Sequence, residues 1–207
     1  MYALISDLLV ARRDEPADDL MSALLGADVD GERLSEEELL GFCFLLVIGG
    51  NDTTTSLLGN GVELLARHPD QRAALAADPS LVPDAVEEML RIAAPTQALP
   101  RTVTRDVERH GVLIPAGSRV MLVWGAANLD DREFPDPDRF DVRRRIDRHL
   151  AFGHGAHFCL GAPLARLEAR VALEELLRRH PRYELAEEPR RLTSSWARAF
   201  ERVPVRL

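Results

Sequence analysis

Hydrophobic residues recur with helical spacing over much of the chain, and the longest such run begins at a clear start signal. Ser35 followed three residues later by Glu38 forms a capping box, and His68-Pro69 ends the pattern. The sequence therefore predicts a helix from Ser35 to about Arg67, roughly 30 residues or 45 Å long. Its middle, Phe42–Ile48, is apolar on every side, which predicts that it crosses a protein interior.

The rest of the pattern predicts shorter helices and a few strands, so the expected fold class is mainly α with small β-sheets. Helices are expected at 1–25, with a break near Pro16, and at about 69–77, 83–93 and 161–180. Strands are expected at 101–107 and 118–123, with a β-like C-terminal tail. Residues 124–158 are rich in Asp, Pro, Arg and Gly and predict a long irregular segment, which is normally functional or disordered.

Composition narrows the class of protein. With 46% hydrophobic and 29% charged residues, the 207-residue chain is typical of one soluble globular domain, and it has no apolar run long enough for a membrane span. The net charge of −8 argues against a nucleic-acid partner, which would require a dominant basic face. Cys43 and Cys159 lie in unlike surroundings and suggest no disulfide, so a cytoplasmic protein is expected.

The segment Phe152–Gly161 (Phe-Gly-His-Gly-Ala-His-Phe-Cys-Leu-Gly) carries the strongest chemical signal and leads directly into the last predicted helix. Its glycines have no Cβ, so the backbone can curl close beneath a flat ligand. A thiolate at Cys159 is favoured there, because the free N–H groups and dipole of a helix N-terminus stabilise negative charge.

Two other interpretations of this loop remain open. His154, His157 and Cys159 could ligate zinc, although their spacing is not a standard zinc pattern and no fourth ligand is evident nearby. A buried cysteine in a glycine-rich turn is the other interpretation, and it assigns the loop no chemistry.

The loop resembles the cysteine loop of the cytochrome P-450 family, Phe-Gly-x-Gly-x-His-x-Cys-x-Gly, at every specified position. Its continuation, Ala162–Glu168 (Ala-Pro-Leu-Ala-Arg-Leu-Glu), is similar to the soluble bacterial branch. The resemblance implies haem b (iron protoporphyrin IX) as cofactor, with Cys159 as the axial thiolate and Phe152 and Gly153 beside the haem. In that family the thiolate pushes electron density onto iron and favours O–O cleavage.

A second signal, Gly49-Gly-Asn-Asp-Thr-Thr54, lies in the middle of the long helix. Two adjacent glycines cost about 1–2 kcal/mol relative to alanine, which a groove or bulge holding a small ligand would offset. Asp52 is costly in an apolar interior unless it is paired or used, and Thr53 could instead bond back to the preceding turn. The segment resembles the family's oxygen-activation motif, which implies that Thr53 assists oxygen activation and Asp52 helps deliver protons.

A third signal is Glu88-Met-Leu-Arg91, which taken alone is an ordinary i,i+3 pair worth about 0.3 kcal/mol. Downstream, Phe134–Phe140 (Phe-Pro-Asp-Pro-Asp-Arg-Phe) lies at the place where the family has its Pro-x-Arg-Phe motif. The resemblance implies a structural charge triad of Glu88, Arg91 and Arg139, because buried charges must satisfy one another. This triad is expected to fix the irregular segment.

Basic residues match two further family features. Arg101 and His157 correspond to positions that contact haem propionates, although a strand-edge arginine and a loop histidine are the ordinary interpretations. A group of arginines could dock an acidic, ferredoxin-type electron donor or could be a solvated face. Its members are Arg143, Arg144, Arg145, Arg148, Arg166 and Arg170.

Apolar residues match the family's substrate-facing positions and imply an apolar organic substrate. These positions are Leu45, Ile48, Gly49 and the stretch Thr96–Leu99, although core leucines would look the same. Gln97 is a polar exception that could hydrogen-bond a substrate oxygen.

Taken together, the resemblance implies the C-terminal half of the cytochrome P-450 fold, as a single haem-binding portion over residues 1–207. Its parts are the long central helix, the Glu-x-x-Arg helix, the irregular meander, the cysteine loop and the final helix. The implied activity is a haem-thiolate monooxygenase that inserts one atom of dioxygen into its substrate. Family members are roughly twice as long, so a truncated, catalytically incompetent haem-binding fragment is the alternative.

Overall fold

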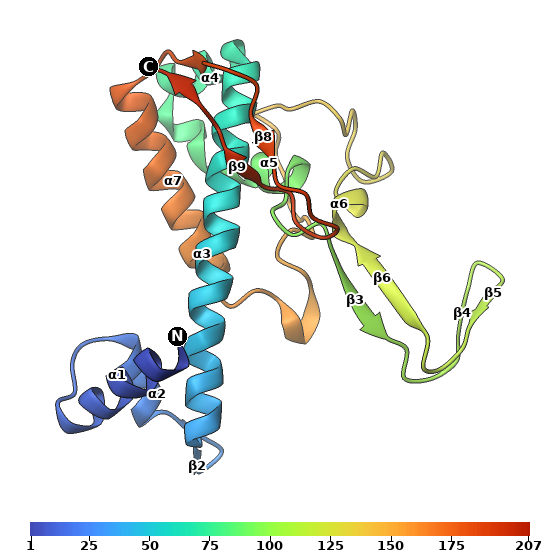
Figure 1. The fold of residues 1–207 in the computed structure, drawn as a ribbon. Coiled ribbons are helices and arrows are strands. Elements are labelled where there is room, and N and C mark those ends of the chain that lie inside the picture. Colours follow the sequence, from blue (N-terminus) through green and yellow to red (C-terminus); the bar gives the residue numbers. More distant parts are fainter. The chain divides into compact units, whose positions relative to one another are not determined.

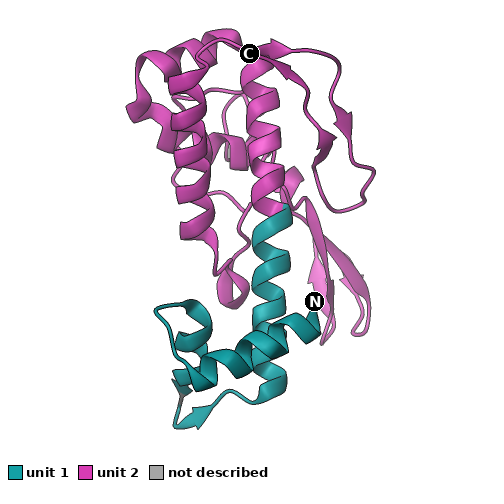
Figure 2. Ribbon diagram, turned by 60° about the vertical axis from the view of Figure 1, so that its left-hand side comes forward, with its two compact units in different colours: residues 1–52 teal, residues 53–207 magenta. Residues whose placement is uncertain are grey.

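The computed structural model describes residues 1–207, with the side chain of Val29 left out. The chain divides into two compact units, Met1–Asp52 and Thr53–Leu207 (Figure 2). The boundary falls within helix α3 (Glu36–Arg67), and every residue of this helix is α-helical (Figure 1). The predicted long helix is therefore confirmed, but its two glycines form no bulge.

The first unit is small and helical. Its elements are α1 (Tyr2–Asp14), α2 (Leu20–Gly26), the paired strands β1 (Asp28–Val29) and β2 (Glu32–Arg33), and the start of α3. The predicted capping box is present, because the Glu38 N–H donates to Ser35 Oγ (3.3 Å) and the Ser35 N–H donates to Glu38 Oε2 (2.8 Å). The core of this unit is formed by Ile5, Leu9, Leu39 and Cys43.

The middle of α3 departs from the prediction. Leu45 is 65% exposed and Ile48 is 44% exposed, and both glycines of the pair lie at the surface. The expectation that Phe42–Ile48 crosses an interior is therefore wrong for this structure, because a helix is buried only where other elements pack on it. Among the described residues of the first unit, the core covers only the face that carries Leu39 and Cys43.

The second unit holds the larger core. Its helices are α4 (Pro69–Ala77), η1 (Pro79–Leu81), α5 (Val82–Ile92), α6 (Trp124–Ala127), η2 (Gly155–His157) and α7 (Ala162–Arg179). Apolar side chains of α3, α4, α5 and α7 meet there, represented by Leu65, Leu75, Leu90 and Leu173. The helices predicted at about 69–77, 83–93 and 161–180 correspond to α4, α5 and α7. Their ends agree with the prediction to within about one residue, which is less than the usual difference between assignment methods.

All strand pairs of the second unit are antiparallel. They are β3 (Ala98–Thr102) with β6 (Arg119–Val123), β4 (Val107–Arg109) with β5 (Val112–Ile114), β7 (Glu184–Leu185) with β10 (Val205–Arg206), and β8 (Arg190–Arg191) with β9 (Phe200–Arg202). The predicted strand 101–107 is wrong beyond Thr102, because a hairpin follows. Its turn places His110 at φ +52° and Gly111 at φ +76°, as a tight hairpin requires.

The segment between α6 and η2 is irregular, as predicted, and it leads directly to the cysteine loop. Within the part of the chain that the structure describes, we find no helix with the length and apolar character needed to cross a membrane.

Candidate functional site

The cysteine loop is a compact turn whose backbone bonds to itself. Gly153 and Gly155 adopt φ +71° and +73°, a left-handed conformation that side chains other than glycine rarely adopt. The Cys159 N–H donates to the Phe152 carbonyl (2.9 Å), which closes the loop. Helix α7 then begins at Ala162, so the cysteine lies at a helix N-terminus as the sequence predicted.

The loop fits a thiolate ligand for a flat cofactor. Cys159 is a free, exposed cysteine, whereas Cys43 is buried in the first unit. A Cβ added to Gly161 would lie 3.9 Å from Cys159 Sγ, an ordinary contact distance, which places this glycine directly beside the sulfur. Phe158 and Leu160, the sequence neighbours of the cysteine, are also exposed, so this end of the loop presents apolar side chains at the surface.

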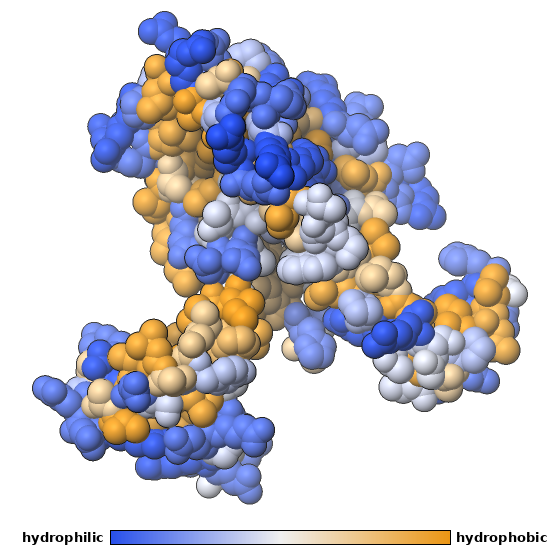
Figure 3. Space-filling model, viewed as in Figure 1, coloured by the Kyte–Doolittle hydropathy of each residue, from blue (hydrophilic) through white to orange (hydrophobic). Residues whose placement is uncertain are grey.

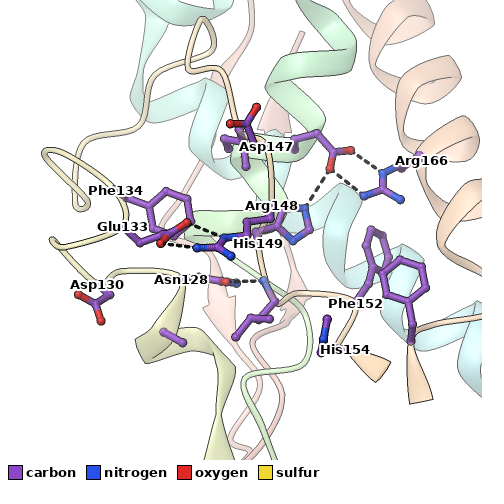
Figure 4. Close-up of a pocket in the computed structure, with 16 residues that line it drawn as sticks. Asn128, Asp130, Glu133, Phe134, Asp147, Arg148, His149, Phe152, His154 and Arg166 are labelled. Atoms are coloured by element: carbon purple, nitrogen blue, oxygen red, sulfur yellow. Dashed lines mark hydrogen bonds and ion pairs between the residues drawn. The ribbon is translucent and has the colours of Figure 1, made fainter. Parts of the chain in front are cut away.

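Beside this loop lies a pocket of about 610 Å³, and one carboxylate at its wall binds two partners (Figure 4). Arg166 of α7 donates from Nε and Nη2 to Glu87 Oε1 and Oε2 at 2.7 and 2.9 Å. The ring of His149 lies 3.0 Å from Glu87 Oε2. Burial raises the pKa of Glu87, but the hydrogen bonds from Arg166 and His149 outweigh it and lower the pKa to about 2.

The adjacent carboxylate, Glu88, forms the predicted charge cluster, but with a different third member. Arg91 donates from Nε to Glu88 Oε2 (2.7 Å), and both side chains are completely buried. The guanidinium that joins them is that of Arg144, whose Nε lies 3.2 Å from Glu88 Oε2. The Asp141 N–H also donates to Glu88 Oε1 (3.0 Å), so the carboxylate holds the irregular segment directly.

The expectation that the Arg139 side chain completes the triad is therefore wrong. Arg139 contributes its carbonyl oxygen instead, which accepts from Arg91 Nη2 (3.4 Å) and Arg144 Nη2 (3.1 Å). With the carbonyl facing these arginines, the side chain points to solvent and lies 3.8 Å from Asp141. The motif match selected Arg139 by its position in the sequence, which does not determine whether a side chain or a carbonyl faces the buried pair.

The glycine–threonine motif of α3 lies on an accessible part of the helix. Gly49, Gly50 and Asp52 are exposed, and Thr53 is half-buried. Asp52 accepts a hydrogen bond from Asn51 Nδ2 (3.1 Å). A Cβ at either glycine would meet no atom within 4 Å, so packing within this chain does not require glycine there. The expectation of an apolar interior around Asp52 is not met by this chain.

The two residues matched to haem propionates lie on different elements. Arg101 is on β3, where its Nη1 donates to the Pro100 carbonyl (2.9 Å), and His157 ends the short helix η2 as an exposed residue. The described residues contain no group of three or more His, Cys, Asp or Glu that could hold a metal ion, so the zinc arrangement of His154, His157 and Cys159 is not formed.

The side chain of Gln97 forms a hydrogen bond to the backbone. Its Nε2 donates to the Ala94 carbonyl (2.6 Å), and a Cβ on Gly125 would lie 2.2 Å from its Oε1. The amide nitrogen carries a second N–H, so a hydrogen bond from Gln97 to a substrate oxygen stays a prediction. Gly125 packs against the amide so closely that no larger residue fits without a shift, a requirement that the sequence pattern did not show.

The arginine group is largely neutralised by acids of the same chain. Arg144 contacts Glu88 and Arg166 contacts Glu87, as described above. The other ion pairs are Arg145–Asp84 (2.5 Å), Arg148–Glu133 (2.8 Å) and Arg170–Glu174 (4.0 Å). The net positive charge around these arginines is therefore smaller than the count of arginines alone suggests.

Comparison with known proteins places the chain in a family. The cytochrome P-450 family model matches residues 77–191, which is more than half of the chain. The chain is 48% identical over 210 residues to cytochrome P-450 107B1 of Saccharopolyspora erythraea, covering 100% of this chain and 52% of that protein. It is 49% identical over 210 residues to the vitamin D(3) 25-hydroxylase of Pseudonocardia autotrophica, covering 99% and 52%.

Solved structures agree with these sequence matches. Cytochrome P-450 CYP109Q5 from Chondromyces apiculatus superposes with a TM-score of 0.96 at 49% identity, over 99% of this chain and 53% of that chain. The chain therefore belongs to the cytochrome P-450 family, as its motifs indicated, and its mainly helical fold with small sheets is the one found in bacterial members. It spans about half the length of the curated relatives it matches.

Proposed function

We propose that this chain forms the thiolate-ligating part of a haem monooxygenase, with Cys159 as the axial ligand of haem b. When bound, the haem supplies the chemistry that activates dioxygen, so that one oxygen atom enters the substrate and the other leaves as water. The observation that carries this proposal is the exposed Cys159 thiol, held in a self-bonded loop at the start of α7. Membership of the family supports it.

The chain's own residues would take distinct roles. Phe152 and Gly153 would lie beside the cofactor, and Arg101 and His157 would donate to its propionates, because cationic donors suit carboxylates. On α3, Thr53 would hold a proton by hydrogen bonding, and Asp52, being accessible, would pass protons from solvent.

The proposed substrate is an apolar organic molecule, and the proposed electron donor is a ferredoxin-type protein in the cytoplasm. Leu45 and Ile48 offer exposed apolar surface on α3, and Gly49 leaves the helix backbone open beside them. The name of the Pseudonocardia relative denotes a largely apolar substrate, which supports the same class here. Most arginines of the group pair with acids of the same chain, so charge alone is a weak basis for docking the electron donor. The proposed docking therefore also depends on complementary shapes of the two surfaces.

A fragment that binds haem weakly and lacks turnover is the second candidate. The observation that favours it is apolar surface on both units (Figure 3), including Leu45 and Ile48 in the first unit and Leu160, Leu164 and Leu167 in the second. Each such side chain left in water forgoes the roughly 1.5–3 kcal/mol that burial contributes.

One spectrum separates these candidates. The chain is loaded with haemin, reduced and exposed to carbon monoxide, and a red-shifted Soret band reports thiolate ligation. Cys159→His should abolish the band, whereas Cys43→Ala, at the buried cysteine of the first unit, should leave it intact. A full band in the Cys159 variant contradicts the ligand assignment. No band in the unmodified chain supports the second candidate.

The roles of the α3 residues have their own test in any preparation that turns over. Thr53→Ala should divert reducing equivalents to peroxide or water, and Asp52→Asn should slow turnover while leaving substrate binding intact. Unchanged coupling and rate in both variants would remove these residues from the proposal.

A further inference from the structure

Helix α5 carries two neighbouring carboxylates that hold different segments of the chain. Consecutive helical residues point about 100° apart. Glu88 is therefore directed to Arg91, Arg144 and the irregular segment. Glu87 is directed to His149, at the entry of the cysteine loop, and to Arg166, one turn into α7. The two segments that flank Cys159 thus meet at one carboxylate.

The hydrogen bonds of His149 define its tautomer. The Ala151 N–H donates to His149 Nδ1 (3.1 Å), so Nδ1 is unprotonated and accepts. The ring proton is therefore on Nε2, which donates to Glu87 Oε2 (3.0 Å). The side chain of His149 is only 3% exposed, so this donor has little access to water if the carboxylate is lost. Figure 4 shows His149 and Arg166 converging on the same carboxylate.

Arg166 extends this connection to the cysteine itself. Its guanidinium lies over the ring of Phe152, 4.6 Å from the centroid. The carbonyl of Phe152 accepts the Cys159 N–H (2.9 Å). Glu87 is therefore connected to the loop by two routes. One runs through its contact with His149 at the start of the loop, and the other runs through Arg166 and Phe152 to the Cys159 amide.

We propose that Glu87 is a positioning residue for Cys159, which clamps both ends of the cysteine loop to helix α5. The clamp follows from geometry alone; its meaning for an iron ligand rests on the proposed function. The carboxylate also neutralises Arg166, so removing it leaves a guanidinium without its ion-pair partner beside the loop. This role is separate from that of Glu88, which holds the irregular segment.

The clamp is tested on the whole chain without cofactor, by amide hydrogen exchange resolved to the loop. Four proteins are compared with the unmodified chain: Glu87→Gln, Arg166→Gln, the double variant, and Glu175→Gln. Glu175 is the matched control, a half-buried α7 acid that pairs with Arg178 (2.7 Å) on its own helix. Nitrogen NMR shifts of the His149 ring report which nitrogen carries the proton.

In Glu87→Gln, exchange at the Ala151 and Cys159 amides should rise on the order of tenfold to a hundredfold, the loss expected for hydrogen bonds to a charged group. Exchange in α4 and in the control should stay unchanged. The double variant should exchange more slowly than the product of the two single effects predicts, because no guanidinium is left unpaired. The His149 proton should remain on Nε2, since the Gln oxygen still accepts.

Three results would overturn the clamp: unchanged loop exchange, an equal rise throughout the second unit, or purely multiplicative effects in the double variant. A wild-type His149 with its proton on Nδ1 would also overturn it. If Glu87→Gln does not fold, the charge-balanced double variant is compared with Arg166→Gln. If loop exchange rises in Glu87→Gln but the unmodified chain gives no carbon monoxide band, the proposed function is contradicted and the clamp is not. If the band is present but loop exchange does not change, the clamp alone is contradicted.

Discussion

The Glu88 cluster and the middle of α3 both carry polar residues that the sequence marked as important, yet their surroundings are opposite. Glu88 and Arg91 are completely buried, and Arg144, Asp141 and the Arg139 carbonyl satisfy them. Around Gly49 and Asp52 the helix surface is open, and neighbouring apolar side chains are exposed. The second unit therefore contains the partners of its buried charges, whereas the motif on α3 lies on an accessible helix surface.

Removing Arg91 tests the buried side of this comparison and should have the largest effect. Arg91→Ala breaks the completely buried ion pair with Glu88 and leaves Arg144 as the remaining guanidinium beside it, which should lower the free energy of unfolding by about 3–5 kcal/mol. Urea unfolding measures the loss. The control is Arg178→Ala, whose exposed pair with Glu175 should contribute about 0–1 kcal/mol. Similar losses in both variants would contradict the importance of burial.

The pH dependence of stability tests Glu87, the neighbour of Glu88 on α5. Its folded-state pKa of about 2 lies below the ordinary 4.5, so its stabilisation is complete above pH 4.5 and is lost as pH falls toward 2. The full loss is at most about 3 kcal/mol for a shift of this size. Unfolding measured at pH 6 and pH 3 should show a larger decrease in the unmodified chain than in Glu87→Gln. Equal decreases would mean that other acids account for the pH dependence.

The third member of the triad is tested by comparing two arginines. Arg144→Ala removes a largely buried partner of Glu88 and should cost about 1–3 kcal/mol, as expected for a hydrogen bond to a charged group. Arg139→Ala removes an exposed side chain but keeps the carbonyl that accepts from Arg91, so its cost should be within about 0.5 kcal/mol. A larger loss for the Arg139 variant would restore the original assignment.

The exposed middle of α3 is tested by a substitution that should slightly raise the free energy of unfolding instead of lowering it. Gly50→Ala should stabilise the chain by about 0.5–1 kcal/mol, because alanine favours a helix and the new Cβ meets no atom within 4 Å. Gly125→Ala is the contrast, since its Cβ would lie 2.2 Å from Gln97 Oε1 and should destabilise. Thermal melts measure both changes. Destabilisation by Gly50→Ala would mean that packing, not function, requires this glycine.

Local signals in the sequence determined much of this protein. Helix α3 starts at the Ser35–Glu38 capping box and ends before His68-Pro69, because these residues satisfy or remove hydrogen bonds of the adjacent turns. The cysteine loop was readable because left-handed glycines and a helix start lie within ten consecutive residues. The family followed from the same short motifs. The β4–β5 hairpin was missed, although His110-Gly111 marks its turn.

Tertiary structure alone decided which side chains meet. Glu88 and Arg144 lie 56 residues apart in sequence, and Glu87 and Arg166 lie 79 apart, so no local pattern selects these partners. The direction of Arg139 depends on where its carbonyl is placed, and the exposure of Leu45 depends on what packs against α3. Spacing along a chain fixes which residues share an element, but the packing of elements fixes which charges are buried together.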